Sequence, residues 1–174
     1  MIPNRWYAVL ESKEVRQGRP LGATRMNRKL VFWRDRKGAV QCVADTCVHR
    51  GVALSTGKVI GDSIQCPFHG LEFAGSGACT LIPANGKASP IPQRYSAPSF
   101  PVRDEHGFIW LWWGEARDAY PPVPFFDDID GSFSSSTLRS PGPLITPAPS
   151  RTSWTWPTSP SCMPPPSVAE GGPS

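Results

Sequence analysis

Two short segments of the sequence combine cysteine and histidine at a spacing that could bind a metal. The first reads CVHRG from Cys47 to Gly51, and the second reads CPFHG from Cys66 to Gly70. Sixteen residues separate His49 from Cys66. Each segment offers one thiolate and one imidazole, ligands that iron and zinc both accept. The pattern therefore predicts one metal centre that is built by two loops.

Two kinds of centre use two thiolates and two imidazoles. Zinc binds such a set around a single tetrahedral ion, whereas a [2Fe–2S] cluster can be held by two cysteines on one iron and two histidines on the other. Zinc fingers usually place both cysteines in one loop and both histidines after a helix. Here each loop supplies a mixed pair, and no amphipathic helix is predicted between them. This favours the cluster and leaves a structural Cys₂His₂ zinc module as an alternative.

At these loops the sequence resembles the Rieske iron–sulfur proteins. The resemblance implies that Cys47 and Cys66 hold one iron of a [2Fe–2S] cluster, while His49 and His69 hold the other. Respiratory members of the family carry an additional cysteine in each loop, and neither loop here has one. The run CVHRGVALS instead resembles the N-terminal domain of Rieske-type non-haem iron oxygenases, which hydroxylate or demethylate aromatic rings. The resemblance covers residues 3–138.

An oxygenase of this family needs a second metal centre. Its catalytic domain binds mononuclear Fe(II) through two histidines and a carboxylate. This sequence has three histidines, and only His106, in a charged turn where we expect a solvated side chain, lies outside the two loops. We therefore expect the chain to transfer electrons, assign no catalytic residue to it, and expect the mononuclear iron only in a full-length parent protein.

The resemblance also implies redox partners. These are an NAD(P)H-dependent reductase, a ferredoxin, or both, and the parent proteins are often trimeric. The alternative from another functional class is a stand-alone Rieske ferredoxin that carries electrons. Such ferredoxins are usually shorter and lack the extension through WWGE at residues 112–115.

Charge and hydropathy exclude two other classes of partner. Basic residues outnumber acidic ones by six over residues 1–120, but they are scattered, and we expect the side chains of Arg25, Arg28, Lys29 and residues 34–37 to be solvated. No basic block indicates nucleic-acid binding. The apolar run FIWLWW at residues 108–113 is too short to cross a membrane, and no signal peptide is recognisable. A cytoplasmic protein is therefore predicted.

Short β-rich runs separated by turns must position the two loops. Their regular spacing predicts an all-β fold, a Rieske-type antiparallel β-sandwich with a small two-loop cluster-binding subdomain. Cys42 and Cys79 fall in predicted strands and are expected to be packed thiols. The predicted strands cover residues 6–10, 30–34, 39–44, 59–60, 63–65, 71–73, 78–80, 100–103 and 108–112.

Composition predicts three segments. The Rieske domain is expected over residues 3–118, a linker over 119–140, and a disordered Pro/Ser-rich tail over 141–174. The last 34 residues contain ten of the 21 prolines, which leaves little apolar material to build a core. Asp127, Asp128 and Asp130 are interpreted as an exposed part of the linker rather than as a cation site.

The two tryptophans of the tail suggest a further hypothesis. In the frame that joins the third base of one codon to the first two of the next, the Trp154–Thr155 junction encodes aspartate. The Pro157–Thr158 junction then permits histidine, and Cys162–Met163 encodes histidine or tyrosine. The shifted frame permits D-x-A-H-x-x-x-x-H, which has the spacing of the family's iron-binding motif. The tail is therefore either a frameshifted remnant of the catalytic domain or a genuine proline-rich tail.

Overall fold

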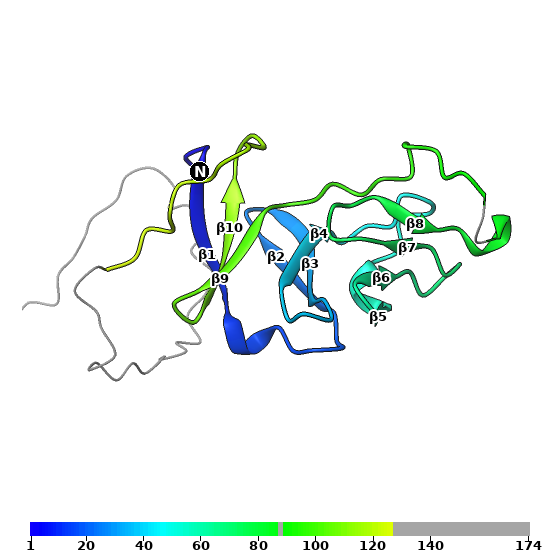
Figure 1. Ribbon diagram of the computed structural model, residues 1–174, viewed down its shortest axis with the longest axis horizontal. Coiled ribbons are helices and arrows are strands. Elements are labelled where there is room, and N and C mark those ends of the chain that lie inside the picture. Colours follow the sequence, from blue (N-terminus) through cyan, green and yellow to red (C-terminus); the bar gives the residue numbers. More distant parts are fainter. Residues whose placement is uncertain (87–88, 127–174) are drawn as a thin grey trace, which may run out of the picture. The chain divides into compact units, whose positions relative to one another are not determined.

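A computed structural model of the chain describes residues 1–86 and 89–126 (Figure 1). The chain divides into two units, Met1–Ile129 and Asp130–Ser174, and every described residue belongs to the first. The described part contains β-strands and three single-turn 3₁₀ helices, η1 (Ser12–Glu14), η2 (Leu54–Thr56) and η3 (Pro83–Asn85). No helix in it is long and apolar enough to span a membrane. The predicted all-β class is confirmed.

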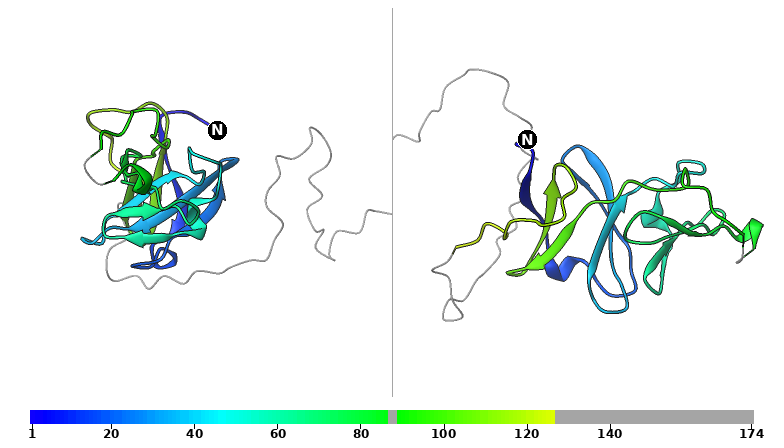
Figure 2. Two further views of the ribbon diagram at one scale, coloured as in Figure 1. Left: turned by 90° about the vertical axis from the view of Figure 1, so that its right-hand side faces the viewer. Right: turned by 45° about the horizontal axis from the view of Figure 1, so that its top comes forward.

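The strands form three antiparallel sheets (Figures 1 and 2). The first sheet has the order β1 (Arg5–Glu11), β10 (Phe108–Trp113), β9 (Val102–Glu105). The second has the order β2 (Leu21–Arg25), β3 (Arg28–Arg34), β4 (Val40–Ala44). The third has the order β5 (Lys58–Ile60), β6 (Ser63–Gln65), β7 (Glu72–Phe73), β8 (Cys79–Leu81).

The second sheet is covered on both faces. Along β3, Leu30 and Phe32 pack in a core shared with β1 and β10 of the first sheet. Val31 and Trp33 point the other way, into a core shared with the third sheet and the two Cys/His loops. Alternate residues of a strand face opposite sides, so a strand buried on both sides must be apolar throughout. This explains the continuous run LVFW, in which all four side chains are fully buried.

The predicted hairpins are confirmed, and one strand was missed. β3–β4, β5–β6, β7–β8 and β9–β10 each pair across the turn that the sequence predicts. β2 was not predicted because LGATR has few strand-forming residues. It pairs with β3 through a turn at Met26 and Asn27, both of which have positive φ (52° and 58°).

Residues 120–125, which the sequence assigns to a linker, pack on the outer face of the first sheet. Val123 is 8% exposed and lies in a core with Trp6, Trp110 and Trp112. The indole of Trp6 donates a hydrogen bond to the carbonyl of Pro121 (2.8 Å). The start of the predicted linker is therefore part of the fold. The acidic trio, the rest of the linker and the tail lie outside the described residues.

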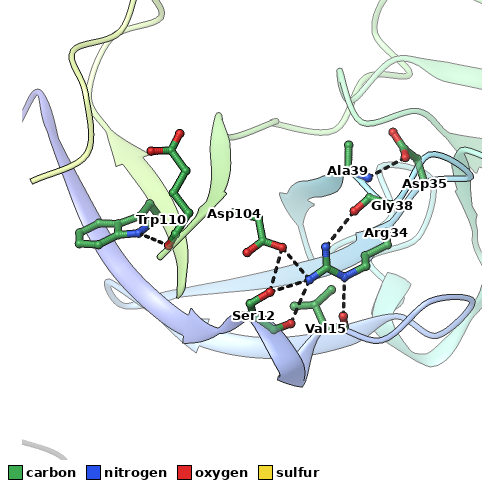
Figure 3. Close-up of polar contacts among 9 residues, drawn as sticks. Ser12, Val15, Arg34, Asp35, Gly38, Ala39, Asp104 and Trp110 are labelled. Atoms are coloured by element: carbon green, nitrogen blue, oxygen red, sulfur yellow. Dashed lines mark hydrogen bonds and ion pairs between the residues drawn. The ribbon is translucent and has the colours of Figure 1, made fainter. Parts of the chain in front are cut away.

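Arg34 joins the first and second sheets (Figure 3). Its guanidinium donates to the carbonyls of Val15 (2.8 Å), Gly38 (2.8 Å) and Ser12 (3.0 Å). It also forms an ion pair with Asp104 of β9 (2.7 Å), and the Ser12 hydroxyl contacts both charged groups. The Arg34 side chain is only 18% exposed. The expectation of a solvated side chain is therefore wrong for Arg34.

A second basic residue from the same set is also engaged. Arg25 donates from Nε to the carbonyl of Val9 (2.6 Å), which is a contact between β2 and β1. Arg36, in contrast, is 75% exposed and pairs only loosely with Asp62 (3.3 Å). The basic residues of this set thus include half-buried side chains that bond to neighbouring strands and side chains that are solvated, and charge patterning alone does not distinguish the two.

We expect the stability of the domain to fall above about pH 8.5, the ordinary thiol pKa, partly through Cys42. Cys42 is 1% exposed, and burial raises its pKa far above that value. An unfolded chain can ionise this thiol and the folded chain cannot, so the contribution is complete below about pH 8.5 and is lost as pH rises. Between pH 8 and 10, a Cys42→Val variant should lose on average about 1 kcal/mol less per pH unit than the parent in urea unfolding. Equal slopes for the two proteins would contradict this prediction.

Candidate metal centre

The two Cys/His loops have the same backbone construction. In each loop the amide of the cysteine donates to a carbonyl five residues later, at 2.8 Å for both Cys47 and Cys66. The amide of the loop glycine donates back to the cysteine carbonyl, at 2.8 Å for Gly51 and 3.1 Å for Gly70. Both glycines have φ of +71°, a conformation that side chains disfavour. These bonds fix the backbone from which each cysteine and histidine projects.

A buried carboxylate, Asp45, supports the first loop. It is 8% exposed and accepts hydrogen bonds from the Ser55 amide (2.7 Å) and hydroxyl (2.6 Å), one residue into η2. Its own amide donates to the carbonyl of Lys29 at the start of β3 (2.9 Å). Asp45 thereby ties both ends of the first loop together. Sequence reasoning missed it, because an aspartate two residues before a cysteine carries no distinctive signal.

The four predicted ligand residues lie in two pairs. Cys47 and Cys66 are 3% and 2% exposed and belong to the core between the second and third sheets. The imidazoles of His49 and His69 are exposed, and their ring centroids lie 4.7 Å apart. Within the described ranges, no three or more His, Cys, Asp or Glu side chains form a group that could hold one metal ion. A buried thiol pair and an exposed imidazole pair are a donor set that can hold a [2Fe–2S] cluster, with the thiolates on one iron and the imidazoles on the other.

Electrostatics around the thiols act in both directions. Burial raises the pKa of the Cys47 thiol, and the adjacent Cys66 thiol raises it further. The backbone amides of His49 and Arg50 donate to the Cys47 sulfur and lower this pKa. Amide donors of this kind favour a thiolate. The site therefore holds two neighbouring thiols that must both lose protons when a metal binds.

The other candidates from the sequence lie apart from this arrangement. Cys42 and Cys79 are buried free thiols, as expected. His106 is exposed, as expected, but it is not isolated. His106 lies in the turn between β9 and β10, and its ring stacks on that of Phe125 with centroids 4.1 Å apart and an interplanar angle of 2°.

Comparisons with known proteins agree with this geometry. The family described as "Rieske [2Fe-2S] domain" matches residues 5–101. The oxygenase component of chloroacetanilide N-alkylformylase from Rhizorhabdus wittichii is 39% identical over 130 residues, which cover 75% of this chain and 34% of that protein. The oxygenase component of dicamba O-demethylase from Stenotrophomonas maltophilia is 36% identical over 126 residues, which cover 72% of this chain and 36% of that protein.

Solved structures give the same result. Dicamba monooxygenase bound to dicamba superimposes with a TM-score of 0.65 at 35% identity, over 72% of this chain and 37% of that chain. NdmA from Pseudomonas putida CBB5 superimposes with a TM-score of 0.64 at 30% identity, over 71% of this chain and 38% of that chain. The chain spans about a third of the length of these relatives. On the family match and these similarities, it belongs to the Rieske [2Fe–2S] family.

Proposed function

We propose that this chain carries single electrons as the Rieske domain of an oxygenase system. In this proposal Cys47 and Cys66 bind one iron of the [2Fe–2S] cluster, and His49 and His69 bind the other. The observation that carries it is the division of the four side chains into a buried thiol pair and an exposed imidazole pair. A cluster held by such a set accepts and releases one electron at a time.

Each pair of side chains has its own role. The buried thiolates keep the inner part of the centre away from water, because Cys47 and Cys66 are enclosed by the surrounding core. The exposed imidazoles provide the shortest route from the centre to the protein surface. An electron from a reductase or ferredoxin that contacts His49 or His69 would therefore cross only that histidine side chain to reach the centre. Arg50, which is exposed beside His49, can contribute to recognition of an acidic partner.

The oxygenase setting is supported by the extent of the similarity. Alignments to the two oxygenase components above run for 126 and 130 residues, which is longer than the family match over residues 5–101. A full oxygenase reaction, in which O₂ is used on an aromatic or related organic substrate, would need a domain with a mononuclear iron site. The gene sequence beyond codon 130 tests the frameshift hypothesis. A shifted frame that restores D-x-x-H-x-x-x-x-H and continues for a domain would support it, and the absence of one would favour the stand-alone carrier.

Metal analysis of the purified chain tests the identity of the cofactor. We expect a red-brown protein with visible absorption, with about two irons and two acid-labile sulfides per chain. Reduction should bleach the colour and produce a paramagnetic signal. A colourless protein with one zinc per chain would overturn the proposal in favour of the zinc module.

The predicted cytoplasmic location is tested separately, by cell fractionation.

A further inference from the structure

Phe68 lies between two proposed ligands in the second loop and contacts one of them. Its ring centroid is 3.9 Å from that of His69, with an interplanar angle of 41°. The side chain is 59% exposed, so most of the ring faces water although it is strongly apolar. Aromatic contacts of this kind are attractive beyond the effect of the area that they bury. The contact thus fixes two exposed rings against each other on a loop whose backbone is already fixed.

The contact has two consequences for the imidazole. A ring packed on one face limits rotation of the His69 side chain, and so it sets the direction of the ring nitrogens. It also excludes water from that face and replaces the water with an apolar hydrocarbon ring. His69 also lies near His49, at 4.7 Å between ring centroids. The His69 ring therefore has two aromatic neighbours.

We propose that Phe68 is a positioning residue for His69 and that it lowers the reduction potential of the centre. The inference rests on the proposed function. Two ferric ions, two sulfides and two thiolates sum to zero charge, and one added electron makes the reduced centre negative. Water stabilises the more highly charged form, and an apolar ring in its place does not. A ring that excludes water at His69 therefore disfavours the reduced form.

Redox titration of four proteins at pH 7 tests this inference. Phe68→Ala should shift the potential to more positive values and change the paramagnetic spectrum of the reduced protein. Phe68→Trp, which retains an aromatic ring, should stay within the scatter of parent titrations. Val48→Ala is the matched control, because Val48 is an exposed apolar residue (37%) between the cysteine and histidine of the first loop. It should leave the potential unchanged.

The possible outcomes are distinct. An unchanged potential in Phe68→Ala, or an equal shift in Val48→Ala or Phe68→Trp, would overturn the role of Phe68 while leaving the proposed function intact. If Phe68→Ala fails to retain iron, Phe68→Thr decides instead, because it removes the ring, admits water beside His69 and should also shift the potential upward. A parent protein without iron and sulfide would overturn the proposed function itself, and this inference with it.

Discussion

Replacing Cys66 with alanine is expected to leave the purified protein without bound iron, acid-labile sulfide or visible absorption. Cys66 is 2% exposed and is one of two adjacent thiols in the proposed site. The variant leaves one iron with a single thiolate. Neither His49 nor His69 can replace the missing thiolate, because both lie in the exposed pair. Iron should therefore fall from about two per chain to background. Metal and sulfide assays with absorption spectra measure the loss, and far-ultraviolet circular dichroism checks that the strands remain.

The chain offers a matched control for this variant. Cys79 is also buried (9% exposed) and belongs to the same core as Cys66, so Cys79→Ala removes the same atoms from the same environment. It should retain the full iron and sulfide content. A second variant and its control make the same comparison for histidine: His69→Ala should lose the cluster, and His106→Ala should keep it. A Cys66→Ala protein with parental iron content, or a folded Cys79→Ala protein without iron, would refute the ligand assignment.

The two Cys/His loops could be recognised in the sequence because they are local structures. Each spans five residues, ends in a glycine, and closes through a hydrogen bond from the glycine amide to the cysteine carbonyl; the second loop also contains a proline. The hairpins were predictable for the same reason, since turn residues lie between two apolar runs. Strands that follow each other in the sequence could also be predicted to pair. The pairing of β1 with β10 could not be predicted in this way, because it joins residues about a hundred positions apart.

The remaining features depend on contacts between distant segments. The run Arg34–Lys37 consists only of charged residues, and nothing in it distinguishes the half-buried Arg34 from the exposed Arg36. Residues 120–125 are rich in proline and suggest a linker, but Val123 and Phe125 find partners on the first sheet. Asp45 is similarly recognisable only beside Ser55. Whether a charged or proline-rich segment is solvated or packed can thus be decided only when the part of the fold that it contacts is known.

Arg34→Ala is expected to destabilise the domain by about 3 kcal/mol, the largest stability effect that we predict. The substitution removes the donor for the carbonyls of Val15, Gly38 and Ser12, and it leaves Asp104, 29% exposed, without its ion-pair partner. Unsatisfied groups at partly buried positions cost more than the bonds themselves contribute. A loss of this size is a large fraction of the stability of an ordinary domain. Urea unfolding monitored by circular dichroism measures it.

Two further variants separate the geometry of Arg34 from its charge. Arg36→Ala removes a basic residue two positions away whose ion pair is mostly exposed (75% and 58%), and it should cost less than about 1 kcal/mol. Arg34→Lys keeps the charge and can still reach Asp104, but one ammonium cannot serve three carbonyls that the planar guanidinium fork reaches together. It should recover less than half of the loss. A lysine variant as stable as the parent would mean that charge alone holds β9 to β3. Recovery of only a small part would mean that the first and second sheets are joined by the directions of the guanidinium donors.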